Sequence, residues 1–360
     1  MEFNTIASGM GGLSSRVSSL HRHLRQTASY PDDADHTIEP HLLPKNPAIE
    51  DMGLTIAKAH AAYGPSQSDR PTCILFIVQE QERNAFDQRL IEYSVSSQSN
   101  ALVFRVCFND ILRQTTLDGK RNLVFSPPSF PGRSYEVTTV YYRAGYSPRE
   151  YTSEESWAAR LHIERSSAIK CPSVLLHLAG CKKVQQLLAT PDSHHLAKFL
   201  RRESSVEQVK NTFASIYPMD TTAAGLEGRK LATDPKTAQR FVLKPQREGG
   251  GNNVYRTAIP EFLKQTPQSL WPAYILMEMI EPPAQENIIL REGETQKGGV
   301  VCELGVFGSI LWRRGEGGKM GEVFENREIG HVLRTKGSHC EEGGISAGLG
   351  ALDSVCLIDV

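Results

Sequence analysis

The sequence predicts an α/β fold built around a doubly wound parallel sheet, and three observations support this class. Residues 73–78 form an uninterrupted apolar run, which is typical of a parallel strand that is buried on both faces. Strand and helix patterns then alternate along the chain, as they do in doubly wound units. In the last third of the chain, short strand patterns alternate with glycine-rich loops. We expect the doubly wound unit at 71–180.

The individual elements follow from residue periodicity. Residues 11–26 carry apolar side chains at a spacing of three to four, which predicts a helix. Residues 27–48 contain four prolines and are expected to form an extended loop. A second helix is expected at 52–63, where Gly64-Pro65 ends it. The remaining segments are expected as helices at 84–96, 157–167 and 260–264 and as strands at 101–106, 137–142, 241–243, 273–279 and 300–307.

Composition limits the class of protein. A chain of 360 residues is long enough for two or three domains, and 39% hydrophobic with 22% charged residues is typical of a soluble globular protein. A formal net charge of −1 favours neither nucleic acid nor an anionic membrane as a partner. We see no spanning apolar run and no secretory signal. The seven scattered cysteines favour a reducing compartment, so a cytoplasmic location is expected.

Residues 241–255 carry the most informative motif. A short apolar run ends at Lys244, Glu248 follows, and the three glycines 249–251 come next. Lysine offers a compact positive charge to phosphate, and a carboxylate can hold magnesium beside phosphate oxygens. Glycines allow backbone N–H groups to approach phosphate closely. The spacing excludes a Walker loop and a kinase glycine loop, so the segment predicts a nucleotide triphosphate site of another kind.

This motif resembles the eukaryotic glutathione synthetases, which belong to the ATP-grasp ligases. The resemblance extends over the whole chain, and its segments keep the family order, which is more specific than any single motif. The matching segments are 2–6, 79–80, 82–89, 143–146, 182–186, 275–278, 303–305 and 330–336.

The resemblance implies an ATP-grasp fold with an inserted doubly wound substrate domain and a glycine-rich lid. It divides the chain into an incomplete N-terminal part of the ATP-grasp body at 1–70, a substrate-binding domain at 71–180 and an ATP-grasp domain with lid at 181–360. The implied reaction joins glycine to γ-glutamylcysteine with ATP and Mg²⁺, through an acyl phosphate, and gives glutathione, ADP and phosphate. Phosphoryl transfer needs positioning and charge neutralisation rather than a nucleophilic side chain. A homodimer is also implied.

The resemblance assigns the nucleotide and metal residues. Strand periodicity would place Glu2 and Asn4 on one face, where both could meet one magnesium ion with Glu248. Taken alone, Met277 also fits ordinary core packing. Lys182 and Lys244 would contact phosphate and act, with Arg334, as catalytic residues. The ATP-binding set is Lys182, Lys244, Gly249, Gly250, Gly251, Asn253, Tyr255, Met277, Glu278, Glu303, Lys336 and Glu342.

The resemblance also assigns a substrate set. Arginine binds carboxylates through two parallel hydrogen bonds, which suits Arg143 for the dipeptide and Arg334 for the glycine end. The loop at 342–348 would close over the site and exclude water, which would otherwise hydrolyse the acyl phosphate. Without the resemblance, the charged stretch at 82–88 would be a solvated helix face. The substrate set is Glu82, Arg83, Asn84, Gln88, Arg143, Tyr146, Arg334, Ile345 and Ser346.

The chain departs from the family pattern in a few places. Family members carry a further region before the segment that begins at Glu2, so an N-terminally truncated form is expected, without the arginine of that region. Ala7 replaces a common serine, Met279 a lysine and Glu342 an aspartate. Three hypotheses follow: an active glutathione synthetase, a truncated form that binds ATP or a full-length partner without turnover, and a ligase that uses β-alanine in place of glycine.

Overall fold

The computed structural model describes residues 2–30, 39–200, 202–247, 251–291, 293–315, 317, 321–341, 345, 348 and 350–357. The chain divides into two compact units. The smaller unit comprises residues 1–6, 146–149 and 172–282, and the larger unit comprises residues 7–145, 150–171 and 283–360. Both are mixed α/β, as the sequence predicts. In the described part of the chain, no helix is both long and apolar enough to cross a membrane.

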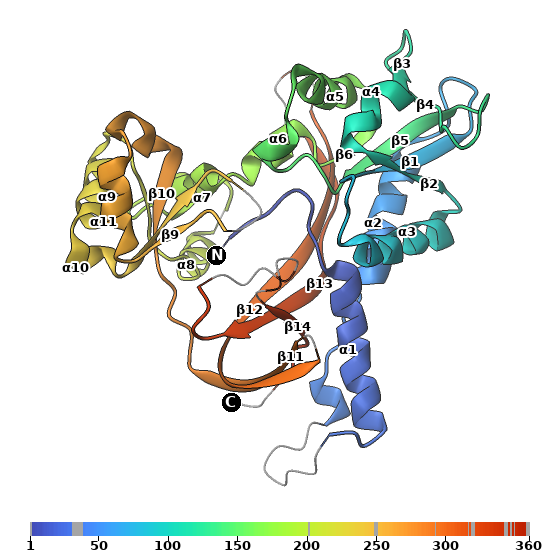
Figure 1. Ribbon diagram of the computed structural model, residues 1–360. Coiled ribbons are helices and arrows are strands. Elements are labelled where there is room, and N and C mark those ends of the chain that lie inside the picture. Colours follow the sequence, from blue (N-terminus) through green and yellow to red (C-terminus); the bar gives the residue numbers. More distant parts are fainter. Residues whose placement is uncertain are drawn as a thin grey trace. The chain divides into compact units, whose positions relative to one another are not determined.

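A six-stranded sheet forms the first half of the larger unit (Figure 1). Its strands lie in the order β2-β1-β5-β4-β3, and β6 also pairs with β5. The contacts of β1 with β2 and β5, and of β5 with β6, are parallel, as predicted for a doubly wound unit. The antiparallel edge of β3 and β4 was not predicted. The strands are β1 Thr72–Val78, β2 Leu102–Cys107, β3 Thr115–Leu117, β4 Leu123–Phe125, β5 Tyr135–Tyr142 and β6 Ile169–Cys171.

Helices α2 and α3 pack against this sheet through an apolar core. Met52 and Ile56 of α2 and Ile91 of α3 lie in one cluster with Phe76 of β1. Helix α2 begins four residues before its predicted start, and Pro47 is its N-cap residue. The helices of this unit are α1 Gly11–Gln26, α2 Ala48–Tyr63, α3 Ala85–Ser99, α4 Ile111–Gln114 and α5 Glu154–Arg165, with short 3₁₀ helices η1 Pro40–Leu42 and η2 Phe108–Asp110.

The second sheet of the larger unit is antiparallel, with the order β11-β12-β13-β14 (Figure 1). Its strands are β11 Gln285–Arg291, β12 Glu294–Arg313, β13 Glu322–Gly337 and β14 Ala351–Asp353. Phe307 faces Gly330 while Gly308 faces Glu328, so Ile329 is the extra residue of a β-bulge. Ile329 is buried in the α2–α3 core cluster, and the bulge therefore fixes β13 to that core.

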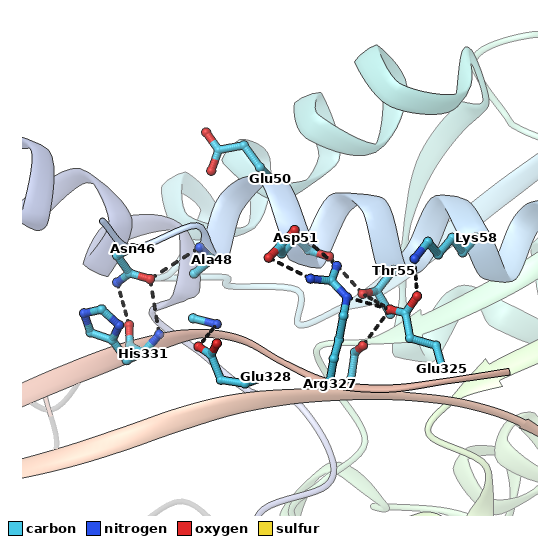
Figure 2. A network of polar contacts seen from close by, with 12 residues as sticks. Asn46, Ala48, Glu50, Asp51, Thr55, Lys58, Glu325, Arg327, Glu328 and His331 are labelled. Carbon is cyan, nitrogen blue, oxygen red and sulfur yellow. Dashed lines mark hydrogen bonds and ion pairs between the residues drawn. The ribbon is translucent and has the colours of Figure 1, made fainter. Parts of the chain in front are cut away.

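A polar network joins α2 to β13 (Figure 2). Arg327 donates to both carboxylate oxygens of Asp51, at 2.9 and 3.1 Å. Glu325 accepts hydrogen bonds from Lys58 and, at 2.9 Å, from Ser309. The network therefore holds strand β13, which also carries two of the predicted site residues, against a helix that is distant in sequence.

The carboxylate of Glu325 makes this network pH-dependent. Burial raises the pKa of Glu325, but hydrogen bonds from Lys58, Ser309 and Arg327 lower it more, from 4.5 to about 2. A depressed pKa stabilises the fold above the ordinary value, and that stabilisation is lost as the pH falls towards the folded-state value. We expect Glu325→Gln to lower the melting temperature at neutral pH, and the difference from wild type to shrink progressively below about pH 4.5.

Thermal melts at several pH values would measure this effect. Glu322→Gln is the matched control, because Glu322 lies on the same strand and pairs with Arg313 on an exposed surface. A melting difference for Glu325→Gln that stays constant with pH would contradict the prediction.

The smaller unit contains a four-stranded antiparallel sheet with the order β7-β10-β8-β9. One face packs on α9 and α11 through Leu243 and Leu276, and the other carries Val242, Ile275 and Met277. The predicted strands at 241–243 and 273–279 are confirmed, as is the helix at 260–264. The strands are β7 Ile216–Pro218, β8 Phe241–Pro245, β9 Val254–Tyr255 and β10 Tyr274–Glu278. The helices are α6 Val174–Ala179, α7 Lys182–Ala189, α8 Glu203–Lys210, α9 Ala223–Thr233, α10 Pro235–Ala238 and α11 Ala258–Gln265, with η4 His195–Lys198 and η5 Gln268–Ala273.

Candidate active site

In the smaller unit, the buried Lys182 and the largely enclosed Lys244 meet one carboxylate. The ammonium groups of Lys182 and Lys244 each lie 3.4 Å from a carboxylate oxygen of Glu2. The lysine side chains are 7% and 14% exposed, whereas Glu2 is 41% exposed. The pair of cations is therefore largely enclosed by the fold, whereas the carboxylate is only partly exposed.

Strand alternation and a helix start position these lysines. Lys244 lies near the end of β8 on the same face as Val242, because side chains alternate along a strand. Lys182 is the first residue of α7, and its ammonium also donates to the Arg247 carbonyl at 2.8 Å. Lys182 thus holds the backbone at Arg247, which leads into the glycine-rich segment.

The segment around Glu2 differs from its prediction. Residues 2–6 were expected to form a strand, and the structure assigns none there. A strand needs a backbone partner, and this segment is held by side chains instead: Gln185 donates to the Phe3 carbonyl at 2.9 Å and Thr5 donates to the His177 carbonyl at 3.4 Å. The argument that placed Glu2 and Asn4 on one strand face is therefore wrong, although both side chains are exposed.

The charges around Glu2 favour its ionised form. Burial raises the pKa of Glu2, but the ammonium groups of Lys244 and Lys182 lower it more, so that the pKa lies below its ordinary value. Phosphate oxygens, which are also anionic acceptors, could take the place of this carboxylate between the two ammonium groups. Magnesium takes one or two protein carboxylates plus phosphate oxygens and water, and Glu2 with the Asn4 amide oxygen fits that demand. In the described part of the chain, no group of three or more histidine, cysteine or acidic residues could hold a metal ion by itself.

The apolar face of the smaller sheet adjoins these charges. Met277 is buried with Val242 and Ile275 on the face that carries Lys244, and Tyr255 packs against the same cluster. This burial agrees with a core role for Met277 as well as with an adenine contact. Asn253 donates to the Tyr255 hydroxyl at 3.1 Å.

The predicted nucleotide residues Glu278 and Gly251 do not belong to the Met277 cluster. The Glu278 carboxylate pairs with Arg240, and alternation along β10 directs it away from Met277. Gly251 adopts φ +68°, and no atom of the described residues lies within 4 Å of where its Cβ would stand, so glycine at this position serves the backbone conformation. The predicted site residues Glu248, Gly249, Gly250, Glu342 and Ser346 lie outside the described residues.

In the larger unit, a second charged cluster lies across β12 and β13. Glu303 and Arg334 face each other in the strand register, with their charged groups 2.9 Å apart. Lys336 reaches the other oxygen of Glu303 at 3.0 Å and donates to the Glu341 carbonyl at 3.0 Å. The structure thus brings together three predicted residues, and the last of these bonds ties them to the start of the predicted glycine loop.

The larger unit also gathers three predicted substrate residues. Arg143 is buried and donates to the Ser8 carbonyl, while a Cβ at Gly9 would stand 3.2 Å from Arg143 Nη2 and 3.7 Å from Asn84 Nδ2. The Gln88 side-chain oxygen accepts from Arg105 at 2.7 Å. Among the described residues, Arg143 Nε and Gln88 Nε2 are buried without a hydrogen-bond partner. Each of these unused donors suits a substrate acceptor such as a carboxylate.

The remaining predicted substrate residues that the structure describes are exposed or only partly buried. Arg83 is exposed, Glu82 accepts from the Asn84 backbone at 2.8 Å, and Tyr146 and Ile345 are partly buried. Sequence reasoning missed Asp87, which is fully buried beside Asn84. The signal available in the sequence was an acidic residue within the helix expected at 84–96. That signal is weak, because the charged stretch at 82–88 also fits a solvated helix face. A cavity of about 420 Å³ between η4 and α8 contains none of the predicted residues.

Comparison with known proteins identifies the family. A family model described as eukaryotic glutathione synthase, ATP binding domain, matches residues 1–357. The chain belongs to the eukaryotic glutathione synthase family. It is 38% identical over 369 residues to the glutathione synthetase large chain of Schizosaccharomyces pombe, covering 99% of this chain and 70% of that protein. It is 40% identical over 358 residues to the glutathione synthetase of Homo sapiens, covering 98% of this chain and 69% of that protein.

A solved structure supports the fold. The apo form of a glutathione synthetase-like effector from Globodera pallida matches with a TM-score of 0.71 and 20% identity, covering 99% of this chain and 71% of that one. For this member of the glutathione synthase family, the predicted ATP-grasp α/β fold and the predicted class of ATP-dependent ligase are therefore confirmed. The roles of individual residues remain predictions.

Proposed function

We propose that this chain joins glycine to γ-glutamylcysteine with Mg-ATP and releases glutathione, ADP and phosphate. The observation that carries the proposal is the convergence of Lys182 and Lys244 on Glu2, next to an apolar sheet face, in a member of the glutathione synthase family. Cations beside an apolar surface suit the phosphates and the base of a nucleotide. The proposal includes the domain division at 1–70, 71–180 and 181–360, a homodimer and a cytoplasmic location.

Cationic, acidic and apolar side chains would each contact a different part of Mg-ATP. The ammonium groups of Lys182 and Lys244 would contact the phosphate oxygens in place of Glu2. Glu2 and Asn4, with Glu248, would then hold magnesium. The metal supplies charge neutralisation between the phosphates. Met277 and Tyr255 would line the base, with Glu278 and Asn253 as further nucleotide contacts. Lys336 and Glu303 would be further nucleotide contacts.

The substrate residues would orient two successive attacks. The terminal carboxylate of the dipeptide attacks the γ-phosphorus, and the bond to ADP breaks. The glycine amine then attacks the acyl carbon, loses a proton, and phosphate leaves with the electrons of the broken C–O bond. Arg143, Asn84 and Gln88, with Glu82, Arg83 and Tyr146, would hold the dipeptide. Arg334 would hold the glycine carboxylate, and the loop with Ile345 and Ser346 would exclude water.

The test is an assay of the purified chain with ATP, magnesium, γ-glutamylcysteine and glycine. Dipeptide-dependent ADP release together with tripeptide formation would support the proposal. ADP release that prefers β-alanine would identify a related ligase. Nucleotide binding without any ADP release would contradict turnover and favour the hypothesis of a binding protein.

Removal of a proposed metal ligand gives a separate prediction. We expect Glu248→Ala to lower turnover by at least about a hundredfold at ordinary magnesium concentration, because one ligand carboxylate is lost. Steady-state rates over a magnesium titration would measure it. The control is Glu261→Ala, because Glu261 is an exposed glutamate of the same unit that pairs only with Lys264 among the described contacts. Equal activity of both variants would reject the role of Glu248.

A further inference from the structure

We infer that Asp87 is a positioning residue of the dipeptide site. It caps helix α1 from a different helix and thereby holds residues 7–10 against Arg143 and Asn84. This inference rests on the proposed function for the identity of the substrate. It adds a residue with no assigned role, and all contacts that support it lie within the larger unit.

The Asp87 carboxylate is fully buried and saturated with donors. Its Oδ2 accepts from the Met10 backbone at 2.9 Å and from Asn84 Nδ2 at 3.1 Å, and its Oδ1 accepts from the Leu13 backbone at 3.0 Å. Helix α1 has no side-chain cap of its own and no acidic residue in its first turn. A carboxylate at this end satisfies free N–H groups and complements the helix dipole. Asp87 therefore supplies the cap that the local sequence of α1 lacks.

The loop before α1 is strained. Ala7 and Met10 adopt φ values of 53° and 71°, in the left-handed region that is unfavourable for a residue with a Cβ. Such conformations persist only where the surroundings hold them. A Cβ at Gly12 would stand 2.6 Å from the Asp87 carbonyl oxygen, so the close approach of α1 to Asp87 requires glycine there. The approach and the strain both indicate that this contact fixes the loop.

The fixed loop shapes the substrate site. The Ser8 carbonyl accepts from Arg143, and Gly9 lies against the Arg143 guanidinium and the Asn84 amide. Because a carboxylate only accepts hydrogen bonds, the Asn84 atom that meets Asp87 must be its nitrogen, which leaves the Asn84 oxygen as an acceptor. Buried Arg143 Nε and Gln88 Nε2 stand as donors. The Asn84 oxygen suits the ammonium group of an α-amino acid, and the Arg143 guanidinium beside it suits the carboxylate.

The decisive variant is Asp87→Asn. Asparagine keeps one acceptor oxygen and replaces the other with an NH2 group, which would face either the Leu13 N–H or the Met10 N–H and the Asn84 amide, so the loop should loosen. We expect the KM for γ-glutamylcysteine to rise roughly tenfold to a hundredfold, while the KM for ATP changes less than about twofold. The matched control is Asp51→Asn, which removes an aspartate from the first turn of α2 that also accepts two hydrogen bonds, at 2.9 and 3.1 Å. The control should lose stability without the selective change in the dipeptide KM.

Amide hydrogen exchange gives a readout that needs no substrate. At least one of the Met10 and Leu13 amides should exchange about tenfold faster or more in Asp87→Asn, and both should exchange at the wild-type rate in Asp51→Asn. If Asp87→Asn does not fold, Gly9→Ala replaces it, because a Cβ there presses on Arg143 while Asp87 stays in place. Gly9→Ala should raise the same KM selectively.

Three outcomes would overturn the inference: an unchanged dipeptide KM, an equal rise in the KM for ATP, or unchanged exchange of Met10 and Leu13. A wild-type chain that neither binds nor converts the dipeptide would instead refute the proposed function. In that case the exchange rates still decide whether Asp87 caps α1 and holds the loop.

Discussion

Lys182→Met should lower kcat/KM for ATP by about 10²–10³-fold, which is the usual effect of removing one preorganised charged or polar group from a transferring centre. The Lys182 side chain is almost fully buried, contacts Glu2 and holds the Arg247 carbonyl at 2.8 Å. Methionine keeps the length and most of the apolar stem but supplies neither the charge nor the donor. Loss of phosphate neutralisation and loss of loop anchoring therefore add in the same direction.

Steady-state kinetics at several ATP concentrations and a melting curve would test this expectation. The neighbouring Lys183 provides the control, because its half-exposed ammonium pairs with Asp220 at 3.4 Å and makes no contact with Glu2 among the described residues. Lys183→Met should retain activity within about threefold. Comparable losses in both variants, or a Lys182→Met protein with normal kinetics, would refute a phosphate role for Lys182.

Arg334→Gln should raise the KM for glycine roughly 10- to 100-fold with little change in melting temperature. A hydrogen bond between charged groups contributes about 1.5–3 kcal/mol, and each 1.4 kcal/mol corresponds to a factor of ten. Arg334 is 47% exposed and pairs with Glu303 across two strands, so the fold depends little on it. The loss should therefore be confined to the substrate whose carboxylate it binds.

The sheet itself provides the control for Arg334. Arg313 lies on β12 and pairs with Glu322 at 2.7 Å on an exposed surface, so it repeats the cross-strand arginine–glutamate pair far from the predicted site residues along the strand. Initial rates against glycine concentration for Arg334→Gln and Arg313→Gln would separate substrate binding from a general effect on the sheet. An unchanged KM for glycine in Arg334→Gln would exclude the proposed clamp.

Much of the fold could be predicted because it is encoded locally. The apolar run at 73–78 and the helical pattern at 11–26 each match an observed element within a residue or two, since periodicity reflects which side of an element is buried. The antiparallel edge of β3 and β4 was missed because each strand has only three residues, too few for a periodic signal. The strand expected at 2–6 failed because a strand exists only where a partner backbone lies alongside.

The sequence alone determined the family, the alternation of strands and helices, and the presence of a lysine ahead of a glycine-rich segment, because each of these is encoded in neighbouring residues. Only the tertiary structure decided that Glu2 lies between Lys182 and Lys244, and that Asp87 caps a helix that begins more than seventy positions earlier. Such contacts join residues far apart in the chain. They form when whole helices and strands pack together, so no local pattern of residues predicts them.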